Sequence, residues 1–230
     1  RTLYQTNLPV PSTPFLGREQ ELADVRGLLE RQVRLVTLTG PGGTGKTRLA
    51  LRAAAVSADD YPDGVWWVPL AAIGDPALVL AHAAQTLDAR DGLAARIGQR
   101  RMLILLDNFE HVMKAADELA DLRESCPNLT LLVTSREVLH LSGEQEYSVP
   151  PFSEEEGETF FLARARAVEP DFQPVEAVSK ICRRLDDLPL ALELAAARVK
   201  AGRRRSVAGR RRRRAAPRAP NTAPRRLRAS

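Results

Sequence analysis

The chain has 230 residues, of which 44% are hydrophobic, enough to bury one large core or one core plus a smaller unit. No run of 18 apolar residues and no signal peptide is visible, so we expect no membrane-spanning helix, no membrane partner and a cytoplasmic location. Cys126 and Cys182 lack metal-ligand spacing and are typical of reduced thiols.

The net charge of +5 is unevenly distributed along the chain. The last thirty residues hold 12 of the 34 basic side chains and no acidic one, so residues 1–200 carry 22 basic against 29 acidic side chains, a net of −7. The body of the protein is therefore acidic. A prediction of nucleic-acid binding from the overall charge would therefore concern only the last thirty residues.

The first informative element is the stretch VTLTGPGGTGKTRLA, residues 36–50. Its spacing of Gly40, four residues, Gly45, Lys46 and Thr47 is the P-loop signature, set between a predicted strand at 33–39 and a predicted helix at 46–58. The glycines allow backbone N–H groups to turn toward an anion, and the helix N-terminus adds its positive dipole end. The predicted nucleotide-binding residues are Gly40, Pro41, Gly42, Gly43, Thr44, Gly45, Lys46, Thr47 and Arg48.

Within this loop, Lys46 is expected to reach the β- and γ-phosphates of ATP, and the Thr47 hydroxyl to take a coordination site on Mg²⁺. The alternative is a glycine-rich turn that binds nothing.

Further along, apolar runs alternate with helical patterns. Strands are predicted at 65–70, 102–106 and 129–134, with a short fifth candidate at 146–150, and helices at 76–88 and 110–124. Asp75 and Pro76 fit an N-cap and first-turn pair. This alternation predicts an α/β fold with a doubly wound parallel sheet, that of a P-loop NTPase.

The strand at 102–106 leads into Asp107, at the strand end where ligands lie in such sheets. Asp107 is predicted to hold Mg²⁺ together with Thr47, although a strand-terminal aspartate can also cap the following helix. The next residue is Asn108, which cannot accept a proton from attacking water. Glu110 could serve as that base, or could favour a helix N-terminus electrostatically.

Arg136 follows the strand at 129–134 and could reach a γ-phosphate, thereby distinguishing ATP from ADP. A solvent-exposed loop arginine is the equal alternative. The predicted catalytic set is Lys46, Asp107, Glu110 and Arg136.

After residue 152 the pattern becomes helical. Ser153 and Glu156 have capping-box spacing at the start of one helix, and two more helices are predicted at 174–185 and 189–200. We therefore expect a linker at 1–14, a nucleotide-binding domain at 15–152 and a partial helical domain at 153–200.

Residues 201–230 are rich in arginine and nearly devoid of large apolar side chains, which predicts a disordered tail. It could bind nucleic acid nonspecifically. Its abrupt start and Arg/Ala/Pro/Gly content also fit a GC-rich gene read out of frame, which would make the chain truncated.

Taken together, the motifs resemble the NB-ARC-like ATPases of the STAND class, in particular those of bacterial signalling and transcriptional regulators. The resemblance covers about residues 8–200 and rests on FLGREQEL (15–22), GPGGTGKTRLA (40–50), LILLDNFEH (103–111), VTSRE (133–137) and CRRLDDLPLALELAAARV (182–199).

The resemblance implies a switch that holds ADP in a closed state and opens and self-associates on exchange for ATP. It places Gly17 and Arg18 on the adenine side, Arg136 as the sensor arginine and Pro189 against the base. The glycine of the family's Gly-Leu-Pro-Leu motif is Asp187 here, which is less suited to a left-handed turn. The family's winged-helix module is replaced by the tail, so a full latch is not expected.

The leading hypothesis is thus a Mg²⁺-dependent ATP/ADP switch with slow hydrolysis, which would contact DNA through an output domain absent from these residues. Three alternatives stay open at this stage: a fast motor-type ATPase, an Arg-tailed nucleic-acid binder, and a truncated, non-functional remnant.

Overall fold

The computed structural model describes residues 5–174 and 176–199 and contains a five-stranded parallel sheet. The strands are β1 (Leu35–Thr39), β2 (Val65–Pro69), β3 (Met102–Asp107), β4 (Leu129–Thr134) and β5 (Glu144–Ser148). Their spatial order is β2-β3-β4-β1-β5, and every neighbouring pair is parallel. The predicted doubly wound parallel sheet is confirmed.

The central strands β1, β3 and β4 are buried along their whole length, as their continuous apolar runs predict. β5 has the polar sequence EQEYS, pairs only with β1 and is partly exposed, as an edge strand can be. It begins two residues earlier than the candidate at 146–150.

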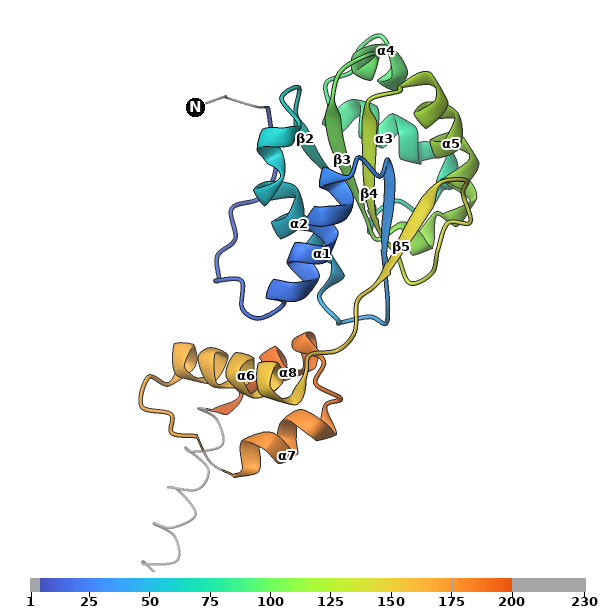
Figure 1. Cartoon of the computed structure of the whole chain (residues 1–230). Helices are drawn as coiled ribbons and strands as arrows, with labels where there is room; N and C mark the ends of the chain where they lie inside the picture. Colours follow the sequence, from blue (N-terminus) through green and yellow to red (C-terminus); the bar gives the residue numbers. More distant parts are fainter. Residues whose placement is uncertain (1–4, 175, 200–230) are drawn as a thin grey trace, which may run out of the picture.

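Helices cover both faces of the sheet (Figure 1). On one face, α1 (Glu19–Glu30) and α2 (Lys46–Val56) pack against alternate strand residues such as Val36 and Leu38. On the other face, α3 (Val79–Thr86), α4 (Leu93–Ile97) and α5 (Ala116–Ser125) pack against Leu35 and its neighbours. Strands β1 to β4 each contribute side chains to both faces, because successive side chains point to opposite sides of the sheet, whereas β5 adds only Tyr147, on the α1–α2 side.

The helix predicted at 110–124 is wrong in its first part. Two short 3-10 turns, Phe109–His111 and Met113–Ala115, precede α5, because Asn108 has a left-handed φ of 66° and Val112 leaves the helical region. The Asp75 cap is confirmed: its side chain accepts a hydrogen bond from the Ala77 N–H at the start of the turn that leads into α3.

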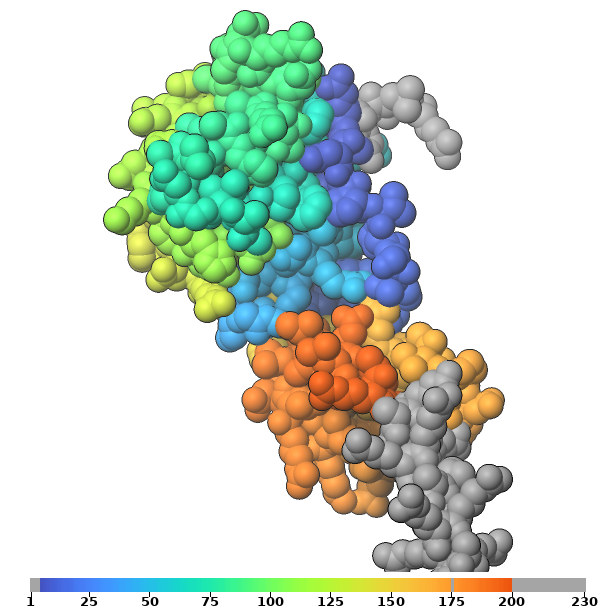
Figure 2. Space-filling view, turned by 180° about the vertical axis from the view of Figure 1, so that it is seen from behind, coloured from blue at the N-terminus to red at the C-terminus, as the bar shows by residue number. Residues whose placement is uncertain are grey.

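A helical unit follows β5 and consists of α6 (Glu154–Val168), α7 (Ala177–Arg184) and α8 (Pro189–Ala196). It has its own apolar core around Phe161, Cys182 and Leu192. The predicted capping box of Ser153 and Glu156 is present at the start of α6. In Figure 2 this unit lies directly against the segment near residue 40, where the glycine-rich loop is found.

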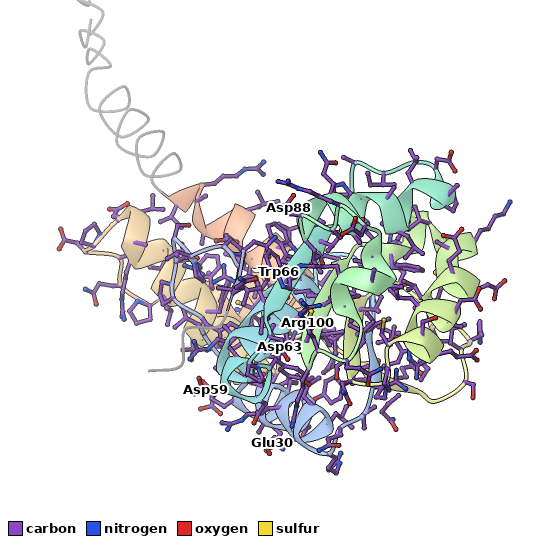
Figure 3. All side chains as sticks on the ribbon, turned by 90° about the horizontal axis from the view of Figure 1, so that it is seen from above. Glu30, Asp59, Asp63, Trp66, Asp88 and Arg100 are labelled. Atoms are coloured by element: carbon purple, nitrogen blue, oxygen red, sulfur yellow. The ribbon has the colours of Figure 1, made fainter. Side chains whose placement is uncertain are left out.

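The amino-terminal segment covers the outer edge of β2. The Asn7 side chain donates to the Trp67 carbonyl oxygen and accepts from the Trp67 N–H, at 2.8 and 2.7 Å, and Thr6 forms a bridge with Val65. Figure 3 looks onto the end of the sheet where the strands begin, with Asp63 and Arg100 labelled; the ligand-binding end of such a sheet is the opposite one.

The expected tail at 201–230 lies outside the described residues. Within residues 5–174 and 176–199, no helix combines the length and the apolar character that crossing a bilayer requires.

Candidate functional site

The glycine-rich loop joins β1 to α2 and has the backbone conformation that its glycines permit. Gly40, Gly43 and Gly45 have φ values of 136°, 86° and 91°, which side-chain-bearing residues rarely adopt. A Cβ on Gly40 would also lie 2.8 Å from the carbonyl oxygen of Val149. The loop therefore needs glycine at these positions to bend between strand and helix.

Lys46 lies at the first turn of α2 and is largely buried, with its ammonium folded onto the loop. Its Nζ donates to the carbonyl oxygens of Gly40 and Pro41, at 2.7 and 3.0 Å. Burial lowers the pKa of Lys46, and the negative charge of Glu110 partly opposes that shift. The positive charge is thus held where the loop and the helix N-terminus meet.

Asp107, at the end of β3, accepts two hydroxyl hydrogen bonds on the same oxygen. The Thr47 hydroxyl donates to Asp107 Oδ1 at 2.7 Å, and the Thr134 hydroxyl donates to it at 2.6 Å. A hydroxyl and a carboxylate that touch in this way are the hard oxygen ligands that Mg²⁺ prefers. The structure therefore brings the two predicted metal ligands together.

Thr134 was not singled out from the sequence. It also accepts a hydrogen bond from the Asn108 N–H, at 3.0 Å, so it holds both Asp107 and the following residue in place. The available signal was that Thr134, like Asp107, is the polar last residue of an apolar strand. In the structure Leu106 pairs with Val133 in the parallel register. Asp107 and Thr134, one position further along each strand, therefore lie side by side.

Glu110 and Arg136 form an ion pair beside the loop, with Arg136 Nε 3.4 Å from Glu110 Oε1. Glu110 comes from the 3-10 turn after β3, and Arg136 from the segment after β4. Both side chains line the same cavity as Lys46. Lys46 interacts electrostatically with Glu110, Arg136 and Asp107, so the four predicted catalytic residues are close together.

The cavity has a volume of about 300 Å³ and lies between the loop and the helical unit. Its polar lining includes Lys46, Thr47, Asn108, Glu110 and Arg136. Its apolar lining includes Phe15, Leu16, Phe152, Phe160, Pro189 and Leu190. Gly42, Gly43, Thr44 and Gly45 of the loop also line it, whereas Gly17, Gly40, Pro41 and Asp107 do not.

Arg18 lines the cavity, but its guanidinium is engaged by the protein. It donates to the carbonyl oxygens of Thr44 and Pro150, at 3.0 and 2.6 Å, pairs with Glu21 at 2.9 Å, and lies over the Phe152 ring. Its backbone has a left-handed φ of 67° and donates its N–H to Glu156. Arg18 thus connects the glycine-rich loop to the start of the helical unit.

Gly17 packs beside the same contact, because a Cβ there would lie 3.3 Å from Phe152 and Glu156.

Arg48 points toward the amino-terminal segment, where it donates to the hydroxyl and carbonyl oxygens of Thr13 and to the carbonyl oxygen of Pro14. Burial and the neighbouring Arg164 lower the pKa of Arg48. Its side chain forms part of the cavity wall from the side of α2.

Asp187 occupies the glycine position of the motif and adopts a left-handed φ of 49°. Its Oδ1 is buried without a hydrogen-bond partner and lies 2.5 Å from where a Cβ on Gly157 would be. Burial and the charge of Glu154 raise the pKa of Asp187. The turn is therefore formed despite the substitution, and the strained aspartate precedes Leu188 and Pro189 directly.

No protein-family model matches the chain. The chain is 44% identical over 200 residues to an uncharacterized protein of Mycobacterium tuberculosis, an alignment that covers 81% of the chain and 51% of the relative. It is 44% identical over 191 residues to a putative HTH-type transcriptional regulator of the same organism, with 77% and 21% covered. It is 31% identical over 226 residues to the regulatory protein AfsR of Streptomyces griseus, with 89% and 23% covered. The chain therefore spans about half the length of the first relative and less than a quarter of the other two.

Among solved structures, the chain is similar to Cdc6p from Pyrobaculum aerophilum, with a TM-score of 0.65 at 16% identity over 86% of the chain and 65% of that protein. It is also similar to a replication initiator DnaA bound to AMPPCP and single-stranded DNA, with a TM-score of 0.56 at 13% identity over 87% and 66%. At these identities the similarity concerns the fold. The predicted P-loop NTPase fold is confirmed.

Proposed function

We propose that this P-loop ATPase domain, which belongs with those of bacterial regulators, is a switch that binds ADP or ATP with Mg²⁺ and hydrolyses ATP slowly. The finer assignment to the NB-ARC-like group, and a cytoplasmic location, are parts of the same proposal. DNA contact through another domain and self-association in the ATP state are further parts.

One observation carries the proposal: Lys46, and Thr47 in contact with Asp107, meet at the wall of a cavity that also has apolar side chains. The phosphates would lie along the loop, where Lys46 and the amino end of α2 supply positive charge. The base would lie against the apolar side chains of Phe15, Leu16 and Pro189.

Thr47 and Asp107 would hold Mg²⁺, and Thr134 would keep Asp107 oriented through its own hydrogen bond. A bound Mg²⁺ supplies positive charge to the phosphate oxygens. Asn108 provides no base next to Asp107, which supports slow turnover, and Glu110 is the carboxylate that could orient a water molecule.

The contact between the loop and the helical unit supports a switching role. Pro189 and Leu190 begin α8 and line the cavity, so the same residues would contact the nucleotide and belong to the helical unit. Exchange of ADP for ATP would then change how α6–α8 pack against the loop.

The test is a calorimetric titration of the 230-residue chain with ADP and with ATP, with and without Mg²⁺. We expect binding that Lys46→Ala reduces by about ten- to a hundredfold, because a charge-assisted contact to phosphate is lost. Lys114→Ala, at an exposed lysine, is the matched control. Equal affinity of wild type and Lys46→Ala would overturn the assignment, and turnover well above about 1 s⁻¹ would favour an enzyme over a switch.

A further inference from the structure

Glu110 and Arg136 are unequal partners in their ion pair. The Glu110 side chain is 11% exposed, whereas that of Arg136 is 66% exposed. Within residues 5–174 and 176–199, Arg136 makes no other ion pair and no hydrogen bond. Among the described residues, the Glu110 carboxylate is therefore the one polar partner of the Arg136 side chain.

The second oxygen of that carboxylate, Oε2, is buried and has no hydrogen-bond partner among the described residues. A buried carboxylate oxygen without a donor is costly, so Glu110 depends on neighbouring positive charge. Arg136 supplies that charge at 3.4 Å, and Lys46 interacts electrostatically with the same carboxylate. The pair therefore forms mainly because the buried Glu110 carboxylate needs a neighbouring positive charge.

Arg136 also lies beside the glycine-rich loop, since its Nη2 is 4.0 Å from where a Cβ on Gly42 would be. A triphosphate seated on this loop would extend one phosphate farther than a diphosphate. The additional phosphate would compete with Glu110 for the Arg136 guanidinium, and it would meet the negative charge of Glu110 itself.

We propose that Glu110 is the resident counter-ion of Arg136, which the terminal phosphate of a nucleoside triphosphate must displace, so that the pair sets the preference between tri- and diphosphate. This inference rests on the proposed function of the cavity. Glu110 acts here as a positioning residue for Arg136. The free energy needed to break the pair weakens the binding of a triphosphate and leaves the binding of a diphosphate unaffected.

The experiment measures the affinities of the 230-residue chain for AMPPCP and for ADP, both with Mg²⁺, and compares their ratio among variants. Glu110→Gln removes the counter-ion, so we expect it to shift the ratio toward AMPPCP by about two- to fivefold, the range for a partly exposed ion pair. Glu110→Asp keeps the charge but shortens the side chain, and it should shift the ratio in the same direction. In an Arg136→Gln background, Glu110→Asp should have no effect.

Glu137→Gln is the matched control, because it removes the same charge from an exposed residue adjacent to Arg136. An unchanged ratio in Glu110→Gln, with or without reduced turnover, would overturn the proposal and leave Glu110 as a base or a structural residue. A shift in Glu110→Gln without one in Glu110→Asp would also overturn it, because simple charge repulsion would then suffice. If wild type bound neither nucleotide, the proposed function itself would fail.

Discussion

The backbone N–H of Leu190 donates a hydrogen bond to the carbonyl oxygen of Gly43, at 3.2 Å. Leu190 is the second residue of α8, and its N–H would have no partner inside the helix. Pro189 precedes it at the first helical position, where the missing N–H of proline costs nothing. The glycine-rich loop therefore caps the amino end of the helix that lines the other side of the cavity.

Gly43→Ala should weaken this contact. Gly43 has a φ of 86°, and a Cβ there would lie 3.3 Å from the Cβ of Leu190. We expect a loss of about 1–2 kcal/mol in the free energy of unfolding, since an alanine is strained at this φ and presses on α8. Urea denaturation without nucleotide measures it.

The matched control is Gly42→Ala, at a glycine without a positive φ whose Cβ would meet only the end of the Arg136 side chain, 4.0 Å away. Equal destabilisation by the two substitutions would contradict the role given to the Gly43 contact.

Glu156 should make the helical unit sensitive to acid. Burial would raise its pKa, but hydrogen bonds from the N–H groups of Arg18 and Ser153, and from the Ser153 hydroxyl, outweigh that effect and lower the pKa. A carboxylate with a lowered folded-state pKa stabilises the fold above its ordinary pKa, and this stability is lost as the pH falls through the folded-state value. Glu156→Gln should therefore be less stable than wild type at about pH 7, and the difference should shrink toward about pH 3.

Unfolding followed by circular dichroism at both pH values measures this difference. Glu155→Gln is the control, because Glu155 is exposed in the same helical turn. A Glu156→Gln variant with the stability of wild type at about pH 7 would show that these hydrogen bonds contribute nothing.

Lys46 should make nucleotide affinity fall at alkaline pH. Burial lowers the pKa of this ammonium in the nucleotide-free protein, so it begins to lose its proton below the pH at which an exposed lysine does. Binding to phosphate requires the protonated form, so affinity is complete below the lowered pKa and falls as the pH rises through it. ADP titrations between about pH 7 and about pH 10 measure the decline.

Lys46→Arg is the comparison, because a guanidinium stays charged throughout that range. Any affinity that this variant retains should not decline with pH. The same alkaline decline in wild type and Lys46→Arg would mean that another group titrates.

Asp187→Gly should stabilise the protein by about 0.5–1 kcal/mol, because glycine adopts the left-handed conformation of this turn more readily. The gain should be larger at about pH 7 than at about pH 4, since the raised pKa of Asp187 means that ionisation opposes folding as the pH rises through the ordinary range. Thermal melting at both pH values checks it.

Asp186→Gly separates the two contributions, because Asp186 has a similar φ of 52° but is exposed. It should show the gain that glycine gives at a left-handed φ. A stability loss in Asp187→Gly would indicate that the packing of this side chain against Gly157 outweighs both effects.

Much of the fold could be predicted because its signals are local. The glycine-rich loop, the buried strands and the capping box of Ser153 and Glu156 are each written in a few adjacent residues. Helix α1 was not predicted. Its first residue follows Arg18, which has a left-handed backbone and gives no side-chain cap, and its buried face consists of Val25, Leu28 and Leu29.

The site was predictable in composition and less so in arrangement. Thr47 and Asp107 were expected to meet because both follow strands of one sheet, and they do. Arg18 donates to the carbonyl oxygens of Thr44 and Pro150, which lie 26 and 132 positions away in the sequence, and no local pattern encodes these contacts. No local pattern encodes the pairing of Glu110 with Arg136 either, because it depends on how the segments after β3 and β4 are placed relative to each other.

The Asn7 side chain, which bonds both the N–H and the carbonyl oxygen of Trp67, has a consequence for solubility. β2 is an outer strand, and an uncovered outer strand offers a row of free backbone groups to which another molecule can add a strand. The Asn7 amide occupies the N–H and the carbonyl oxygen of Trp67, and the Gln5 carbonyl oxygen accepts from the Val65 N–H, so these edge groups are not free to pair with an incoming strand. The amino-terminal segment around Thr6 and Asn7 thus protects the sheet against edge-to-edge aggregation.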